Sequence, residues 1–184
     1  MPSDPSSRFI QTDVLIIGGG AAGLTLALRI ADRAHVTILS KSSLKLGSTY
    51  WAQGGIAAVL DSHDSLQSHV DDTLVAGAGL CHRDIVEYTV GRARESIEWL
   101  VQQGLAFSRD DSPDARSVAG QYHLSKEGGH SHRRVIHAAD ATGKAVFETL
   151  ATRVSKHPNI SFVTNSAAID LLTSSKLGRA GQRC

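Results

Sequence analysis

The chain has 184 residues, of which 41% are hydrophobic and 20% charged, and its formal net charge at pH 7 is +1. This near-neutral composition speaks against a nucleic-acid partner, and no apolar run approaches the roughly 20 residues that span a bilayer, which speaks against a membrane protein. Residues 1–11 are polar and lack the apolar core of a secretory signal, so we expect a flexible lead before the first strand. Two isolated cysteines, Cys81 and Cys184, fit a reducing compartment, and we expect a cytoplasmic protein.

A glycine-rich turn follows the first predicted strand. Residues 13–17 contain the short apolar run Val14–Ile17, which is rich in β-branched side chains, the GxGxxG spacing covers residues 18–23, and a helix-forming segment runs from Leu24 to Ala34. A dinucleotide diphosphate needs this order, because the helix N-terminus offers it unpaired N–H groups. A plain glycine-rich turn between a strand and a helix is the alternative. The residues expected to hold the diphosphate are Gly18, Gly19, Gly20, Ala21, Ala22 and Gly23.

The rest of the chain alternates predicted strands and helices. A second strand over residues 35–40 closes a βαβ unit of the length typical of dinucleotide binding. Further along, we predict helices over 64–78, 84–103 and 141–156, strands over 160–163 and 167–172, mostly loop over 41–59, and an exposed excursion over 108–120. The apolar stripe that marks the 84–103 helix as a core element consists of Val86, Val90, Ala93, Ile97 and Leu100. The pattern predicts an α/β fold with a parallel sheet. The polar tail after residue 172 is typical of a link to a further element, so we expect the chain to be a fragment.

Several further segments resemble one family. Residues 47–58, GSTYWAQGGIAA, resemble the flavin-cradling loop of the succinate dehydrogenase and fumarate reductase flavoprotein superfamily. Residues 71–79, 127–134 and 137–143 resemble the L-aspartate oxidase branch of it. The resemblance runs from about Thr12 to the end of the chain and reaches only the first third or so of such an enzyme. It implies a Rossmann-type FAD-binding fold, here a partial domain over residues 12–184 that lacks the capping and C-terminal helical domains.

The resemblance also implies an activity. Members of this branch oxidise L-aspartate to iminoaspartate, with hydride transfer to FAD and reoxidation of the flavin by oxygen or fumarate. The product enters quinolinate and NAD biosynthesis, which suggests coupling to quinolinate synthase. The resemblance therefore implies an FAD-dependent oxidoreductase for the parent protein and leaves open whether these 184 residues bind FAD or act alone. A fumarate reductase or succinate dehydrogenase type of flavoprotein and an inactive FAD-binding fragment are the alternatives.

Two further groups of residues are expected at the cofactor. Many FAD proteins end the second strand with an acid that binds the ribose, whereas Ser40 and Lys41 stand here and resemble a Ser-Lys pair of the aspartate oxidases. A solvated surface lysine is the alternative for Lys41. Related respiratory enzymes carry a histidine at the position of Ser48 that bonds to the flavin, so the resemblance implies non-covalent FAD. The loop residues expected to surround the flavin are Ser48, Thr49, Tyr50, Trp51, Ala52, Gln53, Gly54 and Gly55.

Glu127 matches the acid that orients the substrate in this branch. Its carboxylate can accept a hydrogen bond from the α-amino group of L-aspartate or hold neighbouring Arg and His side chains, and a surface glutamate is the alternative. A basic cluster follows it, consisting of His130, His132, Arg133, Arg134 and His137. This cluster allows three interpretations: a metal site, a patch for a polyanion, or the scaffold of the cofactor and active site. The absence of a committed third ligand disfavours the metal site, so we predict no metal and favour the scaffold.

Overall fold

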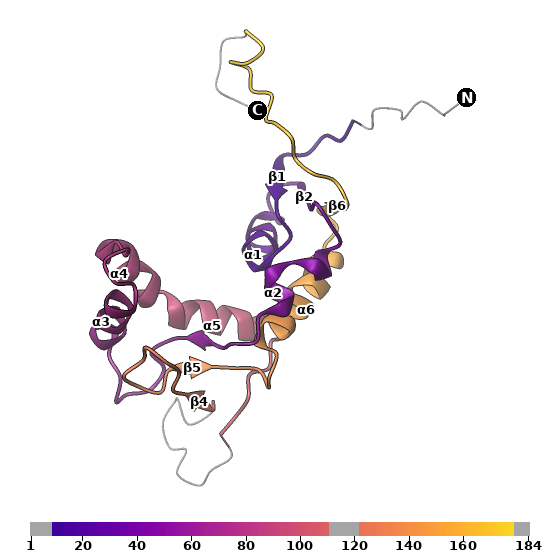
Figure 1. Cartoon of the computed structure of the whole chain (residues 1–184). Coiled ribbons are helices and arrows are strands. Elements are labelled where there is room, and N and C mark those ends of the chain that lie inside the picture. The colour runs from indigo at the N-terminus through magenta and orange to yellow at the C-terminus, as the bar shows by residue number, and fades with distance from the viewer. Residues whose placement is uncertain (1–8, 111–121, 179–184) are drawn as a thin grey trace. The chain divides into compact units, whose positions relative to one another are not determined.

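The chain folds into two compact units. The computed structural model describes residues 9–110 and 122–178 (Figure 1), so most of the predicted lead and of the predicted excursion lies outside the described residues. The first unit takes in the chain up to Gly47 and from Ala151 onward, and the second is Ser48–Leu150. Among the described helices, none is long and apolar enough to cross a membrane.

The first unit is built on a parallel sheet. Its strands are β1 (Val14–Ile17), β2 (Val36–Leu39) and β6 (Ile160–Val163), in the order β1-β2-β6. Val36 of β2 pairs with Val14 on one side and with Ile160 on the other. The first three residues of the central strand β2 are buried, as expected for a parallel strand covered on both faces. The three strands that the sequence predicts here, and the parallel α/β fold, are confirmed.

Helix α1 (Ala21–Ile30) starts earlier than predicted. The sequence suggests a helix from Leu24 to Ala34, but the helix begins directly after Gly20, which is its N-cap, and the backbone of Ala31 caps its other end. The physical reason is that the Gly20 carbonyl already accepts the Leu24 N–H at 3.0 Å, so the last glycine of the motif lies inside the first helical turn. Leu24 and Ala27 are both fully buried.

Strand β1 is an edge strand within the described sheet, because it pairs with β2 alone. Its side chains alternate as a strand requires. Ile16 is 7% exposed, whereas Leu15 and Ile17, on the opposite face, are 47% and 56% exposed.

The second unit combines short helices with a small antiparallel sheet. After the 3₁₀ turn η1 (Leu44–Leu46), which closes the first unit's part of the chain, come the elements α2 (Ser48–Trp51), β3 (Ile56–Ala57), α3 (Leu66–Ala76), α4 (Arg83–Gly91), α5 (Ala93–Gln102), β4 (Leu124–Ser125) and β5 (Val135–Ile136). The sheet order is β3-β5-β4. Helix α6 (Thr142–Ser155) confirms the helix predicted over residues 141–156. The buried apolar side chains of this unit include Ala58, Leu60, Val70, Val90, Ile97, Leu105, Phe107, Leu124, Ile136, Phe147 and Leu150.

Two predicted elements are wrong. The helix predicted over 84–103 is two helices, α4 and α5, with a break at Arg92. Gly91 weakens the helix at this point, and the Arg92 N–H bonds to Thr89 and Val90 rather than four residues back. The strand predicted over 167–172 is irregular, and Ile169 is 92% exposed. It lies beside no described strand, so its backbone has no ladder partner.

Candidate functional site

The glycine turn of the first unit is built on a close approach of the backbone to itself. Gly18 has φ +118°, a conformation that other residues rarely adopt, and its N–H donates to the Leu39 carbonyl at 2.9 Å. A Cβ at Gly23 would overlap the carbonyl oxygen of Gly18. A larger side chain is therefore strained at Gly18 by the backbone conformation and blocked at Gly23 by the Gly18 carbonyl.

The turn leaves main-chain donors at the start of α1. Within the described residues, the N–H groups of Ala22 and Gly23 donate to no protein acceptor, and the first turn of α1 carries no acidic residue. Gly20 caps the helix without a side chain that competes for these donors. A helix N-terminus of this kind stabilises a negatively charged group through its donors and its dipole. The residues of the turn therefore fit a dinucleotide diphosphate.

Ser40 and Lys41 lie at the end of β2, next to the glycine turn. The pairing of Ile17 with Leu39 brings Gly18 and Ser40 to the same edge of the sheet. The Ser40 backbone is fixed, because its N–H donates to the Val163 carbonyl at 2.8 Å and its carbonyl accepts from the Ser166 N–H at 3.1 Å. Lys41 is exposed. The structure thus brings these predicted cofactor residues together in the first unit.

The predicted flavin loop, residues 48–55, lies in the second unit and is fixed against the start of α6. The Gly143 N–H donates to the Ala52 carbonyl at 3.0 Å, and a Cβ at Gly143 would overlap the loop backbone. Tyr50 packs edge-on against Phe147, with the ring centroids 5.6 Å apart. Residues 51–55 are exposed, and the N–H groups of Gln53 and Gly54 donate to no acceptor in the described chain. The loop therefore combines a fixed position with exposed main-chain donors, as contact with a ring system and phosphates requires.

Glu127 lies in the loop between β4 and β5 and is exposed. Its carboxylate accepts a hydrogen bond from the Ser125 hydroxyl at 2.9 Å. The His130 N–H donates to the Glu127 carbonyl at 3.2 Å and closes a turn over residues 127–130. In the small sheet, β5 lies between β3 and β4 and so separates the flavin loop from Glu127. The flavin loop leads into β3 beside the end of β5, whereas Glu127 follows β4 beside the start of β5. The structure does not bring Glu127 and the flavin loop into contact.

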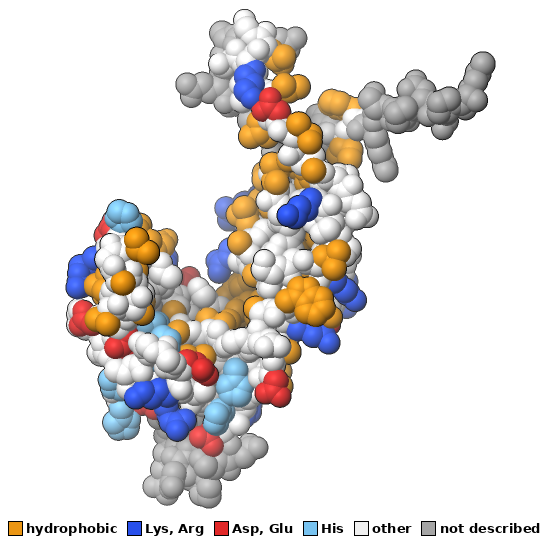
Figure 2. All heavy atoms as spheres, in the orientation of Figure 1, with side chains coloured by type: hydrophobic (Ala, Val, Ile, Leu, Met, Phe, Trp, Pro, Cys, Tyr) orange, Lys and Arg blue, Asp and Glu red, His pale blue; other side chains and the backbone are white. Residues whose placement is uncertain are grey.

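A buried ion-pair cluster holds the loop that carries Glu127, and charged and histidine side chains gather on the surface of the second unit around the β4–β5 hairpin (Figure 2). Arg134 is fully buried and Asp64, its bidentate partner, has a side chain that is 1% exposed, with N–O distances of 2.7 and 2.8 Å. A second carboxylate, that of Asp72 on α3, lies 2.6 Å from the Arg134 guanidinium. We call Arg134, Asp64 and Asp72 the Arg134 cluster. The charge of Arg134 is neutralised inside the protein and is not presented to a ligand.

Asp72 also anchors the loop directly. Its Oδ2 atom accepts hydrogen bonds from the N–H and from the hydroxyl of Ser131, both at 2.7 Å. These bonds, with that of Arg134, lower the pKa of Asp72 from 3.8 to about 2, and the Ser131 N–H contributes most. Asp72 is therefore a carboxylate throughout the neutral range. These partners are about 60 residues apart in sequence, so no local pattern indicated them.

The histidines of the predicted basic cluster have separate environments. His132 Nδ1 lies 2.9 Å from the Ser131 hydroxyl and 3.5 Å from Asp64. His137 Nε2 lies 2.7 Å from Nδ1 of His123, a residue that sequence reasoning did not single out. Among residues 9–110 and 122–178, no group of three or more His, Cys, Asp or Glu side chains is arranged to hold a metal ion. The contacts of the cluster are those of a scaffold around the β4–β5 loop.

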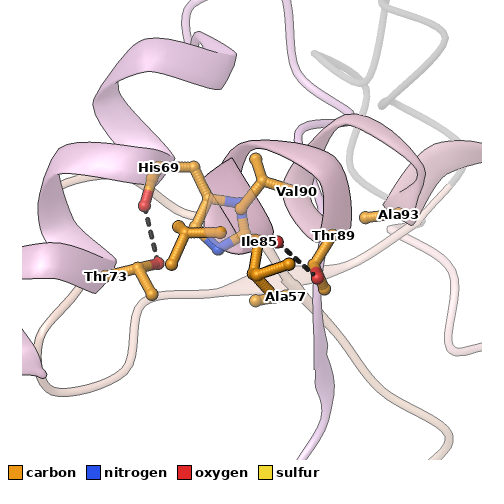
Figure 3. A pocket seen from close by; sticks show the side chains of 8 residues that line it. Ala57, His69, Thr73, Ile85, Thr89, Val90 and Ala93 are labelled. Atoms are coloured by element: carbon orange, nitrogen blue, oxygen red, sulfur yellow. Dashed lines mark hydrogen bonds between the residues drawn. The ribbon is translucent and has the colours of Figure 1, made fainter. Parts of the chain in front are cut away.

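A cavity of about 340 Å³ lies elsewhere in the second unit, between α3, α4 and α5 (Figure 3). It is lined by Ala57, His69, Thr73, Ile85, Val86, Thr89, Val90 and Ala93. The hydroxyls of Thr73 and Thr89 donate to carbonyl oxygens of their own helices, both at 2.8 Å. His69 is 6% exposed, and burial, followed by the nearby charges of Arg134 and His130, holds its pKa below the ordinary 6.5. The cavity is thus apolar and uncharged at neutral pH, and it contains none of the predicted site residues.

Known proteins share both the sequence and the fold. The chain is homologous to the L-aspartate oxidase of Pseudomonas aeruginosa, with 53% identity over 97% of this chain and 33% of that protein. It is 55% identical to the L-aspartate oxidase of Yersinia pestis over the same shares. The chain thus spans about a third of the length of these relatives.

Solved structures agree with this result. The E. coli quinol fumarate reductase FrdA superimposes with a TM-score of 0.79 at 32% identity, over 89% of this chain and 27% of that chain. Mycobacterium smegmatis Sdh1 gives a TM-score of 0.75 at 26% identity, over 85% of this chain and 28% of its own. The family described as FAD binding domain matches residues 13–184. The chain therefore belongs to the family of FAD binding domains.

Proposed function

We propose that this chain is the N-terminal, FAD-binding part of an L-aspartate oxidase. The observation that carries the proposal is the 53% identity to such an oxidase over 97% of the chain, together with a glycine turn that fits a diphosphate. In this proposal the enzyme oxidises L-aspartate to iminoaspartate in the cytoplasm, with oxygen or fumarate as the electron acceptor. Its product supplies NAD biosynthesis, and coupling to quinolinate synthase follows from the reactivity of an imine in water.

In this proposal, different segments of the chain bind different parts of the cofactor. We assign the diphosphate to Gly18–Gly23 and the adenosine ribose to Ser40 and Lys41, with residues 48–55 at the flavin. When bound, FAD would supply the acceptor for the hydride that leaves the substrate. Ser48 cannot form the covalent bond that a histidine forms with flavin, so the cofactor is held by non-covalent contacts alone. In this assignment, residues 12–184 form a partial FAD-binding domain.

Glu127 has the assigned role of orienting the substrate. Its carboxylate is exposed and already held on one side by Ser125, which leaves acceptor positions for an ammonium group. An ammonium-to-carboxylate bond is charge-assisted and selects an amino acid over a plain dicarboxylate. This selection separates an aspartate oxidase from a fumarate reductase type of flavoprotein, which is the second candidate because the FrdA fold matches.

The test has two stages, both on the full-length gene product. A purified protein with a flavin absorbance band supports FAD binding, and acid precipitation should leave all of that flavin in the supernatant if the bond is non-covalent. Turnover with L-aspartate and with succinate then separates the two enzyme candidates. A protein that is colourless and cannot be reconstituted with FAD would instead be the inactive fragment.

A further inference from the structure

The turn over residues 127–130 has few contacts of its own. Glu127, Gly128 and Gly129 are all exposed, and two of the three are glycines, so the segment has an unusually large conformational freedom to lose. A carboxylate that must meet a substrate ammonium group within hydrogen-bond distance requires support from its surroundings. The structure supplies that support at both ends of the turn.

The first support acts on the carboxylate itself. The Ser125 hydroxyl holds Oε1 of Glu127 at 2.9 Å, and Ser125 is part of β4, which pairs with Val135 of β5. The side chain is therefore fixed to the sheet. Only the far end of the turn remains to be fixed.

The second support is the Arg134 cluster. Ser131 follows the turn, and both its N–H and its hydroxyl donate to Oδ2 of Asp72 at 2.7 Å. The same oxygen accepts from Arg134, whose other nitrogens are bound by Asp64. The turn is thereby attached to helix α3, with Arg134 fully buried, the Asp72 side chain 19% exposed and Ser131 exposed.

We infer that Asp72 is a positioning residue for substrate recognition, which acts through Ser131 and the turn to hold the carboxylate of Glu127 where the α-amino group of L-aspartate binds. The inference rests on the proposed function, because it takes Glu127 as the group that meets the substrate amine. Asp72 touches neither substrate nor cofactor in this role. By restricting the turn before the substrate arrives, Asp72 lowers the conformational entropy that the turn loses when the substrate binds.

The experiment compares a ligand with an amine and one without it, in the full-length gene product. Steady-state oxidation gives the KM for L-aspartate, and competitive inhibition gives the Ki for succinate, which has both carboxylates but no amine. Asp72→Asn should raise the KM for L-aspartate about tenfold, the worth of one charge-assisted hydrogen bond, and change the Ki for succinate less than twofold. Glu127→Gln should show the same selectivity, and the double variant should be no worse than Glu127→Gln alone.

The controls separate positioning from simple stability. Asp71→Asn removes a neighbouring carboxylate whose side-chain partners, among the described residues, are Arg83 and Gln67 at the surface, and it should leave both constants unchanged. Ser131→Ala removes the hydroxyl bond to Asp72, together with the contacts of that hydroxyl to Ser68 and His132, and keeps the Ser131 N–H bond and the ion pairs. It should therefore raise the KM for L-aspartate about threefold even if Asp72→Asn does not fold.

Two failures are distinguishable. If the unmodified protein, with FAD bound, does not oxidise L-aspartate, the proposed function is wrong and the inference falls with it. If the unmodified protein is active and Glu127→Gln is selective, but Asp72→Asn and Ser131→Ala weaken L-aspartate and succinate equally or change only the melting temperature, the inference alone is overturned.

Discussion

Replacement of Arg134 by methionine should strongly destabilise the second unit. The variant keeps an unbranched apolar side chain but removes the cation that faces Asp64, whose side chain is 1% exposed, and Asp72. Loss of one partner of a buried ion pair costs about 3–5 kcal/mol, because the remaining charge stays buried and uncompensated. For a folded unit of about 150–250 residues each kcal/mol lowers the melting temperature by about 2–4 °C, so the expected decrease is about 6–20 °C.

Thermal denaturation followed by circular dichroism measures this decrease at pH 7. Arg133→Met is the matched control, because Arg133 is exposed and, within the described part of the chain, its side chain donates to the Leu124 carbonyl alone. Its melting temperature should change by no more than about 2 °C. Adding Asp64→Asn to Arg134→Met should recover part of the loss, since it removes the buried charge. Equal melting temperatures for Arg134→Met and Arg133→Met, or a further loss on adding Asp64→Asn, would refute the reasoning.

Three more outcomes follow from the structure. Gly23→Ala places a Cβ against the Gly18 carbonyl, so FAD should bind about 5- to 150-fold more weakly, as about 1–3 kcal/mol of overpacking implies. Gly91→Ala is the control, because nothing lies near its Cβ, and it should retain flavin. Equal flavin titrations of the two variants would count against the assigned diphosphate site. The lowered pKa of Asp72 contributes folding stability above pH 3.8, and this contribution is lost as the pH falls toward about 2. Acid titration should therefore unfold the unmodified protein more steeply in this range than the Asp72→Asn variant. Parallel unfolding curves would contradict the contacts of Asp72. Because the pKa of His69 is lowered in the folded chain, the unfolded chain binds a proton at this histidine below pH 6.5 that the folded chain does not bind. The stability of the unmodified protein should therefore decline as the pH falls below 6.5, and the stability of His69→Leu should decline less. Melting temperatures at pH 5 and 7 would reveal the difference.

The sequence predicted those parts of the molecule whose signals are local. The strand, glycine turn and helix of residues 13–34 follow from hydrophobicity and glycine spacing over a short window, and the structure shows them with only the helix boundary shifted. The break at Arg92 escaped prediction because the apolar stripe continues through it. The strand predicted over 167–172 failed because a strand depends on its neighbours as much as on its own residues.

The candidate site also contains some residues with a local sequence signal and others without one. The geometry of the glycine turn was predictable because its glycine spacing lies in adjacent positions, whereas its contact with a cofactor stays a prediction. The partners of Arg134 were not, since Asp64 lies 70 positions away and nothing in either local sequence marks a buried pair. A cluster of basic residues suggested a scaffold, but which of them is buried and which is exposed is decided by tertiary packing alone.

The open side of β1 has a practical consequence for work with this segment. Within the described residues no strand pairs with this side of β1, so its backbone donors and acceptors beside Leu15 and Ile17, which are 47% and 56% exposed, are a template on which another extended chain can add. Produced in isolation, the segment should self-associate and lose solubility as its concentration rises. Charged replacements at these two outward positions, made before any flavin titration, would give a better-behaved reagent without touching the glycine turn.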